Sequence, residues 1–156
     1  MGNFFGNHDQ WRALTEAGGD HRRLRLAQTF LMTSPGNIPM LYQGDEVGMF
    51  GEQDPDNRKM MVFSGLTADQ QASLENVRRL GKAREAHSAL RRGSRQTVVL
   101  EDWFWVYKVT HQGDEVYVAI NRDDDKSYAP PAGYVDVLGN CSGGVVPILS
   151  SCVFVK

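Results

Sequence analysis

The polar triplet Asn7-His8-Asp9, which follows the aromatic pair Phe4-Phe5, constrains this chain more than any other stretch. Apolar residues that give way at once to dense polar residues predict a short strand ending in a loop. An imidazole and a carboxylate buried side by side at the end of a strand are costly unless they have polar partners or a substrate. The triplet therefore predicts either a binding site or a set of polar groups that caps the loop.

A second informative block follows, with the sequence GNIPMLYQGDEVGM over residues 36–49 and DPDNR over residues 54–58. The apolar run from Ile38 to Gln43 is bounded by turn residues, which is typical of a buried parallel strand. Residues 44–61 are rich in Gly, Asp and Pro, and they are too many for a simple connector. Long ordered loops after barrel strands are where such folds carry their sites.

In order, spacing and residue type, the two blocks resemble the ends of the seventh and eighth barrel strands in the alpha-amylase family of glycoside hydrolases. The resemblance implies an α/β unit followed by an all-β unit. Residues 1–91 would be an incomplete C-terminal portion of a (β/α)8 TIM barrel, comprising its last two strand/helix units. A parallel barrel closes only with all of its strands, so the resemblance implies that the rest of the barrel precedes this segment in a longer protein.

Two amphipathic helices are predicted within residues 1–91. Asp20 is a plausible N-cap for a helix that reaches about Met32. Thr67, with Gln70 at capping-box spacing, begins a second helix that ends near Ala86. For the first helix we expect an apolar face and a solvated face, made respectively by Leu24, Ala27, Phe30 and Leu31 and by Arg22, Arg23, Arg25 and Gln28.

Residues 92–156 are predicted to form an antiparallel β-sandwich. Five runs have strand-like composition and are separated by Gly and Asp clusters: residues 97–100, 103–109, 116–121, 134–138 and 145–155. Alternation along the second run places Trp103, Trp105 and Tyr107 on one face. This face is either a carbohydrate platform or a packing surface against the barrel helices, and we favour packing.

By resemblance, Asp9 is the family's third carboxylate, which stabilises the oxocarbenium-like transition state, and His8 and Asn7 bind the same sugar. The Asp54/Arg58 pair resembles the branch that includes neopullulanases, cyclomaltodextrinases and oligo-1,6-glucosidases. In that branch such a pair grips vicinal sugar hydroxyls, although a local ion pair that fastens the loop is the alternative. Tyr42 either stacks on a sugar or belongs to the core.

The family's nucleophile and general acid lie on the fourth and fifth barrel strands, so we expect them upstream of residue 1. Asp45-Glu46 reads as an exposed doublet and offers no specific substitute. The parent enzyme would act on alpha-glucan or malto-oligosaccharide by a retaining mechanism, and this segment alone would be inactive. Its open barrel edge would associate with the missing N-terminal barrel or with itself. The alternative is a non-catalytic carbohydrate- or partner-binding β module.

Composition narrows the remaining function classes. A formal net charge of -2 and the lack of a basic tract argue against nucleic-acid binding, and no apolar run reaches the length of a membrane span. No Cys/His spacing suits a metal site, and no cofactor is expected. Calcium occurs in some amylases, but its usual ligands lie outside this segment. Cys141 and Cys152 are either bridged or free, and the sequence leaves the compartment open.

Overall fold

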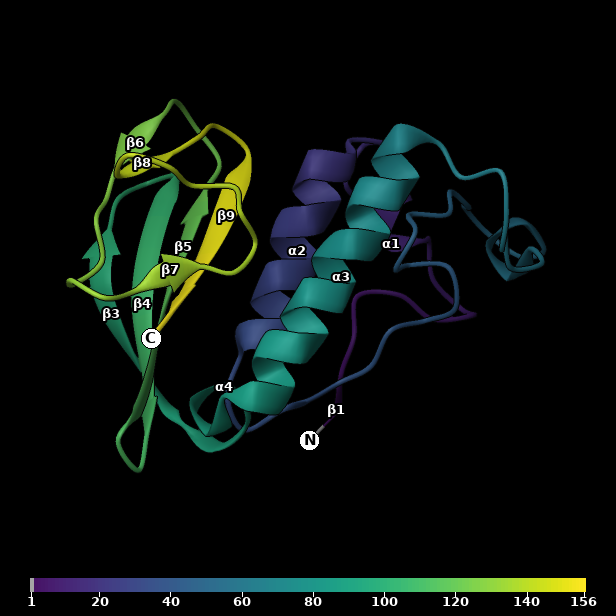
Figure 1. Cartoon of the computed structure of the whole chain (residues 1–156). Helices are drawn as coiled ribbons and strands as arrows, with labels where there is room; N and C mark the ends of the chain where they lie inside the picture. Colours follow the sequence, from purple (N-terminus) through teal and green to yellow (C-terminus); the bar gives the residue numbers. More distant parts are fainter. Residues whose placement is uncertain (1) are drawn as a thin grey trace.

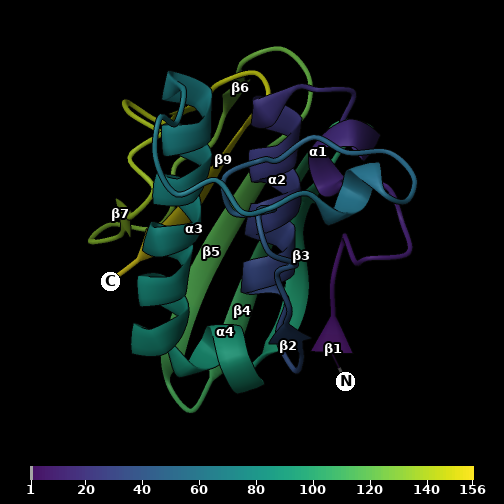
Figure 2. The same cartoon turned by 90° about the vertical axis from the view of Figure 1, so that its right-hand side faces the viewer.

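The computed structural model describes residues 2–156, which form three layers (Figure 1). A β-sheet forms one outer layer, two long helices that run parallel to each other form the middle, and loops with a short strand pair form the other outer layer. The two long helices, α2 (His21–Thr33) and α3 (Ala68–Ala86), cover one face of the sheet (Figure 2). No helix among residues 2–156 has the length and apolar character needed to cross a membrane.

The predicted helix starts are confirmed. The Asp20 carboxylate accepts a hydrogen bond from the Arg22 amide at 2.8 Å, and this caps α2. Thr67 and Gln70 form both hydrogen bonds of a capping box at the start of α3. These bonds satisfy amides that have no partner within the helix.

The expectation of a solvated polar face on α2 is wrong for Gln28. Its side chain is only 2% exposed because α2 is enclosed by α3 and by the loop after the second strand. Gln28 Nε2 donates to the Asp45 carbonyl at 3.0 Å, and Asn76 Nδ2 donates to Gln28 Oε1 at 3.0 Å. Arg25 is also half-buried, whereas Arg22 and Arg23 are exposed as expected.

The first two strands, β1 (Gly2–Asn3) and β2 (Ile38–Pro39), pair in parallel, with Gly2 opposite Ile38. Both are shorter than predicted, and their apolar flanks are not buried. Phe5 is 40% exposed and Ile38 is 67% exposed. A parallel strand is buried only when other strands flank it and helices cover both faces, and within residues 2–156 this pair has no third strand.

Three short helices complete the helical part. They are α1 (Ala13–Glu16), the 3₁₀ helix η1 (Asp56–Arg58) and α4 (Ser88–Arg92). The predicted long loop after β2 is otherwise irregular. The α4 helix follows α3 directly, and its buried Leu90 contributes to the core beneath the sheet.

The C-terminal sheet is antiparallel in the order β3-β4-β5-β9-β7, and a separate two-stranded ribbon pairs β6 with β8. The strands are β3 (Ser94–Leu100), β4 (Phe104–His111), β5 (Asp114–Asn121), β6 (Lys126–Ser127), β7 (Val135–Asp136), β8 (Val145–Val146) and β9 (Ser150–Val155). The single strand expected over residues 145–155 is therefore wrong. Pro147, which has no amide hydrogen to donate, and Leu149, with φ of 50°, separate β8 from β9.

The two faces of the sheet bury different clusters. The face toward the helices contains Val109, Val116, Val118 and Val153, packed against Leu80 and Leu90. The other face contains Phe104, Val106, Ala119, Cys152 and Phe154, covered by β8 and nearby loops. The second layer of the predicted sandwich is thus only a short ribbon, because the helices cover the opposite face.

The aromatic strand β4 packs internally, as favoured from the sequence. The Trp105 ring lies 6.0 Å from Phe30 and 4.6 Å from Tyr107, and the Arg95 guanidinium lies 4.9 Å from its centroid. The Tyr107 hydroxyl hydrogen-bonds Thr33 at 2.6 Å, and burial raises the pKa of Tyr107 to about 12. Trp103 lies just before β4 and is 51% exposed, so the predicted alternation begins only at Phe104 and does not include Trp103.

Candidate functional site

A polar pocket of about 350 Å³ lies just beyond β1 and the loop that follows β2. It is lined by His8, Asp9, Trp11, Gln53, Asp54, Asn57 and Arg58. Four of the predicted site residues, His8, Asp9, Asp54 and Arg58, therefore share one pocket although two loops supply them. Their side chains remain largely exposed, so the pocket is open to a ligand.

Arg58 links the two loops at the centre of this pocket. Its Nη2 lies 3.5 Å from Asp9 Oδ1, and its Nε lies 3.2 Å from Asp54 Oδ1. The same Nε donates to the His8 carbonyl at 3.2 Å, and His8 Nε2 lies 3.3 Å from Asp9 Oδ2. Two carboxylates, a guanidinium and an imidazole are thereby aimed at one space, a combination suited to gripping sugar hydroxyls.

Asn57 holds this geometry in place, and sequence reasoning missed it. Its side chain is 1% exposed, and its Nδ2 donates to the carbonyls of His8 at 2.9 Å and Gln10 at 3.0 Å. The bonds fix the backbone on both sides of Asp9. Its place inside the DPDNR block was the only available signal, and nothing in the sequence indicated its partners.

A second connection between the loops runs through Gly51. Its carbonyl accepts from the Arg12 amide at 2.9 Å and from Thr15 Oγ1 at 2.8 Å. A Cβ at position 51 would lie 2.8 Å from the Asp56 carbonyl oxygen and 3.0 Å from the Asn57 Cα. Only glycine allows this close approach without displacing η1.

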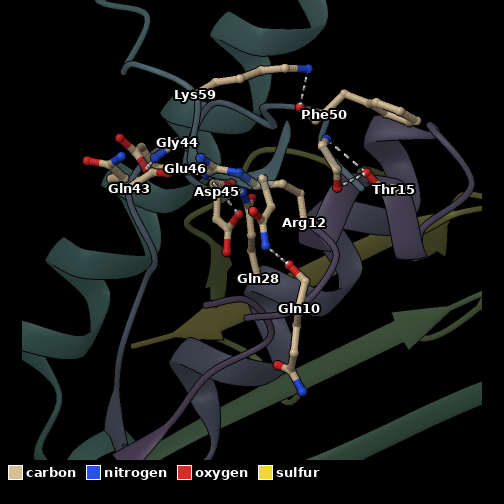
Figure 3. A network of polar contacts seen from close by, with 12 residues as sticks. Gln10, Arg12, Thr15, Gln28, Gln43, Gly44, Asp45, Glu46, Phe50 and Lys59 are labelled. Atoms are coloured by element: carbon tan, nitrogen blue, oxygen red, sulfur yellow. Dashed lines mark hydrogen bonds and ion pairs between the residues drawn. The ribbon is translucent and has the colours of Figure 1, made fainter. Parts of the chain in front are cut away.

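Beneath the pocket lies a buried ion pair, shown in Figure 3. Arg12 is 0% exposed, and its Nη1 lies 3.9 Å from Asp45 Oδ1 and also donates to the Gln43 carbonyl. Arg12 Nε and Nη2 and Asp45 Oδ1 have no hydrogen-bond partner among the described residues. The expectation that Asp45 is exposed is therefore wrong. Asp45 is only 4% exposed, because Arg12 and α2 enclose it.

Burial governs the electrostatics of Asp45. Desolvation raises its pKa from 3.8 to about 6, against the opposing attraction of Arg12 and with a smaller contribution from Glu46. At 3.9 Å the ion pair is long, so it offsets only part of the cost of burying the charge. Neutral pH leaves this carboxylate mostly ionised in a place that favours its neutral form.

Two predicted site residues lie outside the lining of the polar pocket. The Tyr42 ring lies beneath the Arg12 guanidinium at 4.5 Å, where it covers the buried ion pair. Asn7 Oδ1 accepts a hydrogen bond from the Asp9 amide at 2.8 Å, so Asn7 shapes the turn before Asp9.

A larger groove of about 590 Å³ lies between α1, α2 and the sheet. Phe5, Leu26, Ala27, Phe30, Trp105 and Ile120 give it a mainly apolar lining. Its polar side chains, Glu16, Arg23 and Arg122, supply no pair of carboxylates, so it does not suit glycoside chemistry. We interpret it as a packing surface.

A cluster with metal-ligand atoms occurs elsewhere, at Asp136, Cys141 and Cys152, whose ligand atoms lie within 4.8 Å of one another. The two cysteines form a disulfide. Asp136 accepts four backbone hydrogen bonds, from the amides of Leu138, Asn140, Cys141 and Val153. These bonds occupy both carboxylate oxygens, so the cluster is better explained as a structural cross-link between neighbouring backbone segments than as a metal site.

The comparisons with known proteins agree with one another. Residues 1–118 match the alpha amylase catalytic domain family. A cyclomaltodextrinase from Geobacillus thermopakistaniensis is 36% identical over 130 residues, which cover 82% of this chain and 22% of the relative. A cyclomaltodextrin glucanotransferase from Geobacillus stearothermophilus is 35% identical over 150 residues, covering 90% of this chain and 20% of the relative.

Solved structures extend the likeness to the whole chain. The gamma-CGTase from alkalophilic Bacillus clarkii superposes with a TM-score of 0.81 at 27% identity, covering 100% of this chain and 26% of that one. The alpha-amylase from Geobacillus thermoleovorans, complexed with acarbose, gives 0.83 at 26% identity, covering 99% and 38%. The chain thus spans about a fifth of the curated relatives' length, between 20% and 22%. On this evidence the chain belongs to the alpha-amylase family of glycoside hydrolases.

Proposed function

We propose that this chain supplies the transition-state-binding corner of an enzyme that cleaves alpha-glucosidic bonds in starch-like glucans or malto-oligosaccharides by a retaining mechanism. The pocket that joins His8, Asp9, Asp54 and Arg58 is the observation that carries this proposal. The names of the relatives support the substrate class, since they include cyclomaltodextrinases and cyclomaltodextrin glucanotransferases.

Asp9 takes the role of transition-state stabiliser. As the sugar flattens toward an oxocarbenium ion, hydrogen bonds from its hydroxyls to a carboxylate strengthen, which lowers the barrier. Arg58 and His8 flank Asp9 at 3.5 and 3.3 Å and orient it without burying it. His8 binds the same sugar, and Asn7 contributes by setting the turn.

Asp54 and Arg58 bind sugar hydroxyls at the rim. Their contact of 3.2 Å uses Arg58 Nε and leaves the other Asp54 carboxylate oxygen and Arg58 Nη1 available to vicinal hydroxyls. Because Tyr42 lies under Arg12, we assign it to support of the pocket floor. The Asn57 clamp fixes the distance between the two halves of the pocket.

The nucleophile and the general acid belong to the remainder of a longer enzyme. Residues 1–91 represent the last two strand/helix units of its barrel, and residues 92–156 represent its C-terminal β domain. The exposed flanks of β1 and β2 are the edge that the rest of the barrel, or a second copy, would cover. No cofactor takes part in this chemistry, and any calcium would be held by the rest of the parent enzyme.

A titration of the chain with maltoheptaose, followed by NMR, tests the binding role. We expect shifts at His8, Asp9 and Arg58 and no turnover of the sugar. Asp9→Asn should remove these shifts, whereas Asp124→Asn, an exposed carboxylate in the turn after β5, should leave them unchanged.

Two results would contradict the proposal. Turnover that Asp9→Asn abolishes would show that the chain holds its own acid and nucleophile. Shifts confined to Trp103 and its neighbours would support a non-catalytic carbohydrate-binding β module. The internal stacking of Trp105 against Phe30 and Tyr107 argues against such a module, because it leaves Trp103 without an aromatic neighbour on the surface.

A further inference from the structure

A second polar cavity, of about 320 Å³, lies where α2 and α3 meet the loop after β7 (Figure 1). Its lining comprises Arg25, Ala72, Glu75, Asn76, Arg79, Leu138, Gly139 and Asn140. It shares no residue with the pocket at Asp9. Its volume falls at the lower end of the range for small-molecule pockets.

Arg25 lines this cavity and is half-buried without a carboxylate partner in the part of the chain that the structure describes. Its Nη1 is closed off from solvent and has no hydrogen-bond partner among residues 2–156, and no described carboxylate lies within 4.0 Å of it, so the guanidinium has to turn toward the cavity to meet a ligand there. A half-buried guanidinium without an anionic partner is costly, because it loses water without gaining a counter-charge. The carboxylates that attract it, Asp69 and Asp20, act only from a distance.

Arg79 brings a second guanidinium to the same space. Its Nε donates to Glu75 Oε1 at 3.0 Å, and its Nη1 donates to the Leu138 carbonyl at 2.6 Å. These bonds hold the group at the cavity wall and leave Nη2 without a protein partner in the described chain. Asn140 is fixed beside it, since its Nδ2 donates to the Ser151 carbonyl at 2.9 Å.

The charges of the lining groups favour an anion. Arg25 and Arg79 contribute two positive charges and Glu75 contributes one negative charge, which leaves the cavity with an excess of one positive charge. Planar guanidinium groups bind tetrahedral oxyanions through paired, charge-assisted hydrogen bonds. We propose that this cavity binds a phosphate group, with Arg25 as its main ligand and Arg79 as the second.

The phosphate group has two chemical sources, the free ion and a phosphate ester on a sugar. Calorimetric titration of the chain with inorganic phosphate and with glucose 6-phosphate, at constant ionic strength, separates them. We expect saturable binding at one site. Tight binding of the free ion alone identifies inorganic phosphate, and equal or tighter binding of glucose 6-phosphate identifies a sugar phosphate.

Arg25→Gln should weaken binding by about tenfold, because it removes a charge-assisted hydrogen bond from the half-buried part of the cavity wall. Arg78→Gln is the matched control, since Arg78 is exposed on α3 and does not line the cavity. Its affinity should equal that of the unchanged chain. Lack of saturable binding, or equal binding by Arg25→Gln, would overturn the proposal.

A second measurement protects the test against a variant that fails to fold. In the unchanged chain, phosphate should shift the Nε–H signals of Arg25 and Arg79 and the Gly139 amide, while the His8 and Asp9 amides stay in place. Shifts at His8 and Asp9 instead would show that phosphate enters the proposed sugar pocket, and would overturn the second site. Because the residue sets differ, failure of one proposal leaves the other standing.

Discussion

The two halves of the molecule differ in how fully they bury their apolar side chains. In the sheet, Val106, Val109 and Val118 are 0% exposed, and every central strand has hydrogen-bonded neighbours on both sides. In the first part of the chain, Ile38 is 67% exposed and Phe63 is 86% exposed, and the strand pair β1/β2 has two residues in each strand. The difference indicates that most of the stability comes from the sheet and the helices packed against it. The site loops are held in place mainly by a few hydrogen bonds and ion pairs.

The core beneath the sheet should give the largest single effect. Leu90 is 0% exposed, so Leu90→Ala should lower the free energy of unfolding by about 2–5 kcal/mol through lost burial and a residual cavity. Ile38→Ala, at an exposed position, should change it by less than about 0.5 kcal/mol. Urea unfolding followed by circular dichroism measures both. Equal losses would show that the strand pair is part of the same core.

The buried ion pair tests whether the loop region carries electrostatic strain. The pKa of Asp45 is raised from 3.8 to about 6, so the folded state binds this proton more tightly than the unfolded state. The resulting stability is fully present below about pH 4 and is lost as the pH rises through about 6. Two pKa units correspond to about 3 kcal/mol at most.

Asp45→Asn should therefore remove this pH dependence and leave the variant at least as stable as the unchanged chain at pH 8. Thermal unfolding from pH 4 to pH 8 measures it, and Asp124→Asn serves as the exposed control. A less stable Asp45→Asn at pH 8 would show that the attraction of Arg12 outweighs the burial cost, contrary to our assignment.

The disulfide in the C-terminal half should stabilise the fold by an amount similar to the effect of Asp45. Cys141 and Cys152 are separated by 11 residues, and closing a loop of that length stabilises a fold by about 2–3 kcal/mol in the chain-entropy account. Reduction with a dithiol should lower the melting temperature of the unchanged chain. A variant with both cysteines replaced by alanine should not respond to the reductant, and an equal response would point to another cause.

Sequence reasoning succeeded where a local pattern decides the structure. The N-cap at Asp20 and the capping box at Thr67 depend on near neighbours and are confirmed, as is the alternation along β4 for Trp105 and Tyr107. Periodicity misjudged Gln28, because its partners Asp45 and Asn76 are distant in sequence. The burial expected for Ile38 failed because burial of a strand depends on neighbouring strands and helices.

In the candidate site, too, some residues could be predicted from the sequence and others could not. Resemblance selected His8, Asp9, Asp54 and Arg58, which the fold places around one pocket, and their roles stay predictions. The groups that support them were not predictable. Asn57 and Arg12 act through backbone carbonyls on another loop, and carbonyls have no signature in a sequence.

The smallest expected effect is at the start of α3, and it tests where the stable C-terminal core ends and the region of the site loops begins. The α3 helix begins next to the exposed loop around Phe63 and ends in the core beneath the sheet. Thr67→Ala removes the cap of its first turn, which typically costs about 1 kcal/mol. If that turn unfolds together with the core, urea unfolding should show the full loss.

Hydrogen exchange then decides between joint and independent opening of this turn. We expect joint opening, because the buried Ser73 and Asn76 link the early turns of α3 to α2. Under joint opening the amides of the first turn and those of the sheet should lose protection to the same extent. Faster exchange confined to residues 68–71, with unchanged global stability, would contradict this and place the boundary inside α3. The first turn would then open with the site loops rather than with the core beneath the sheet.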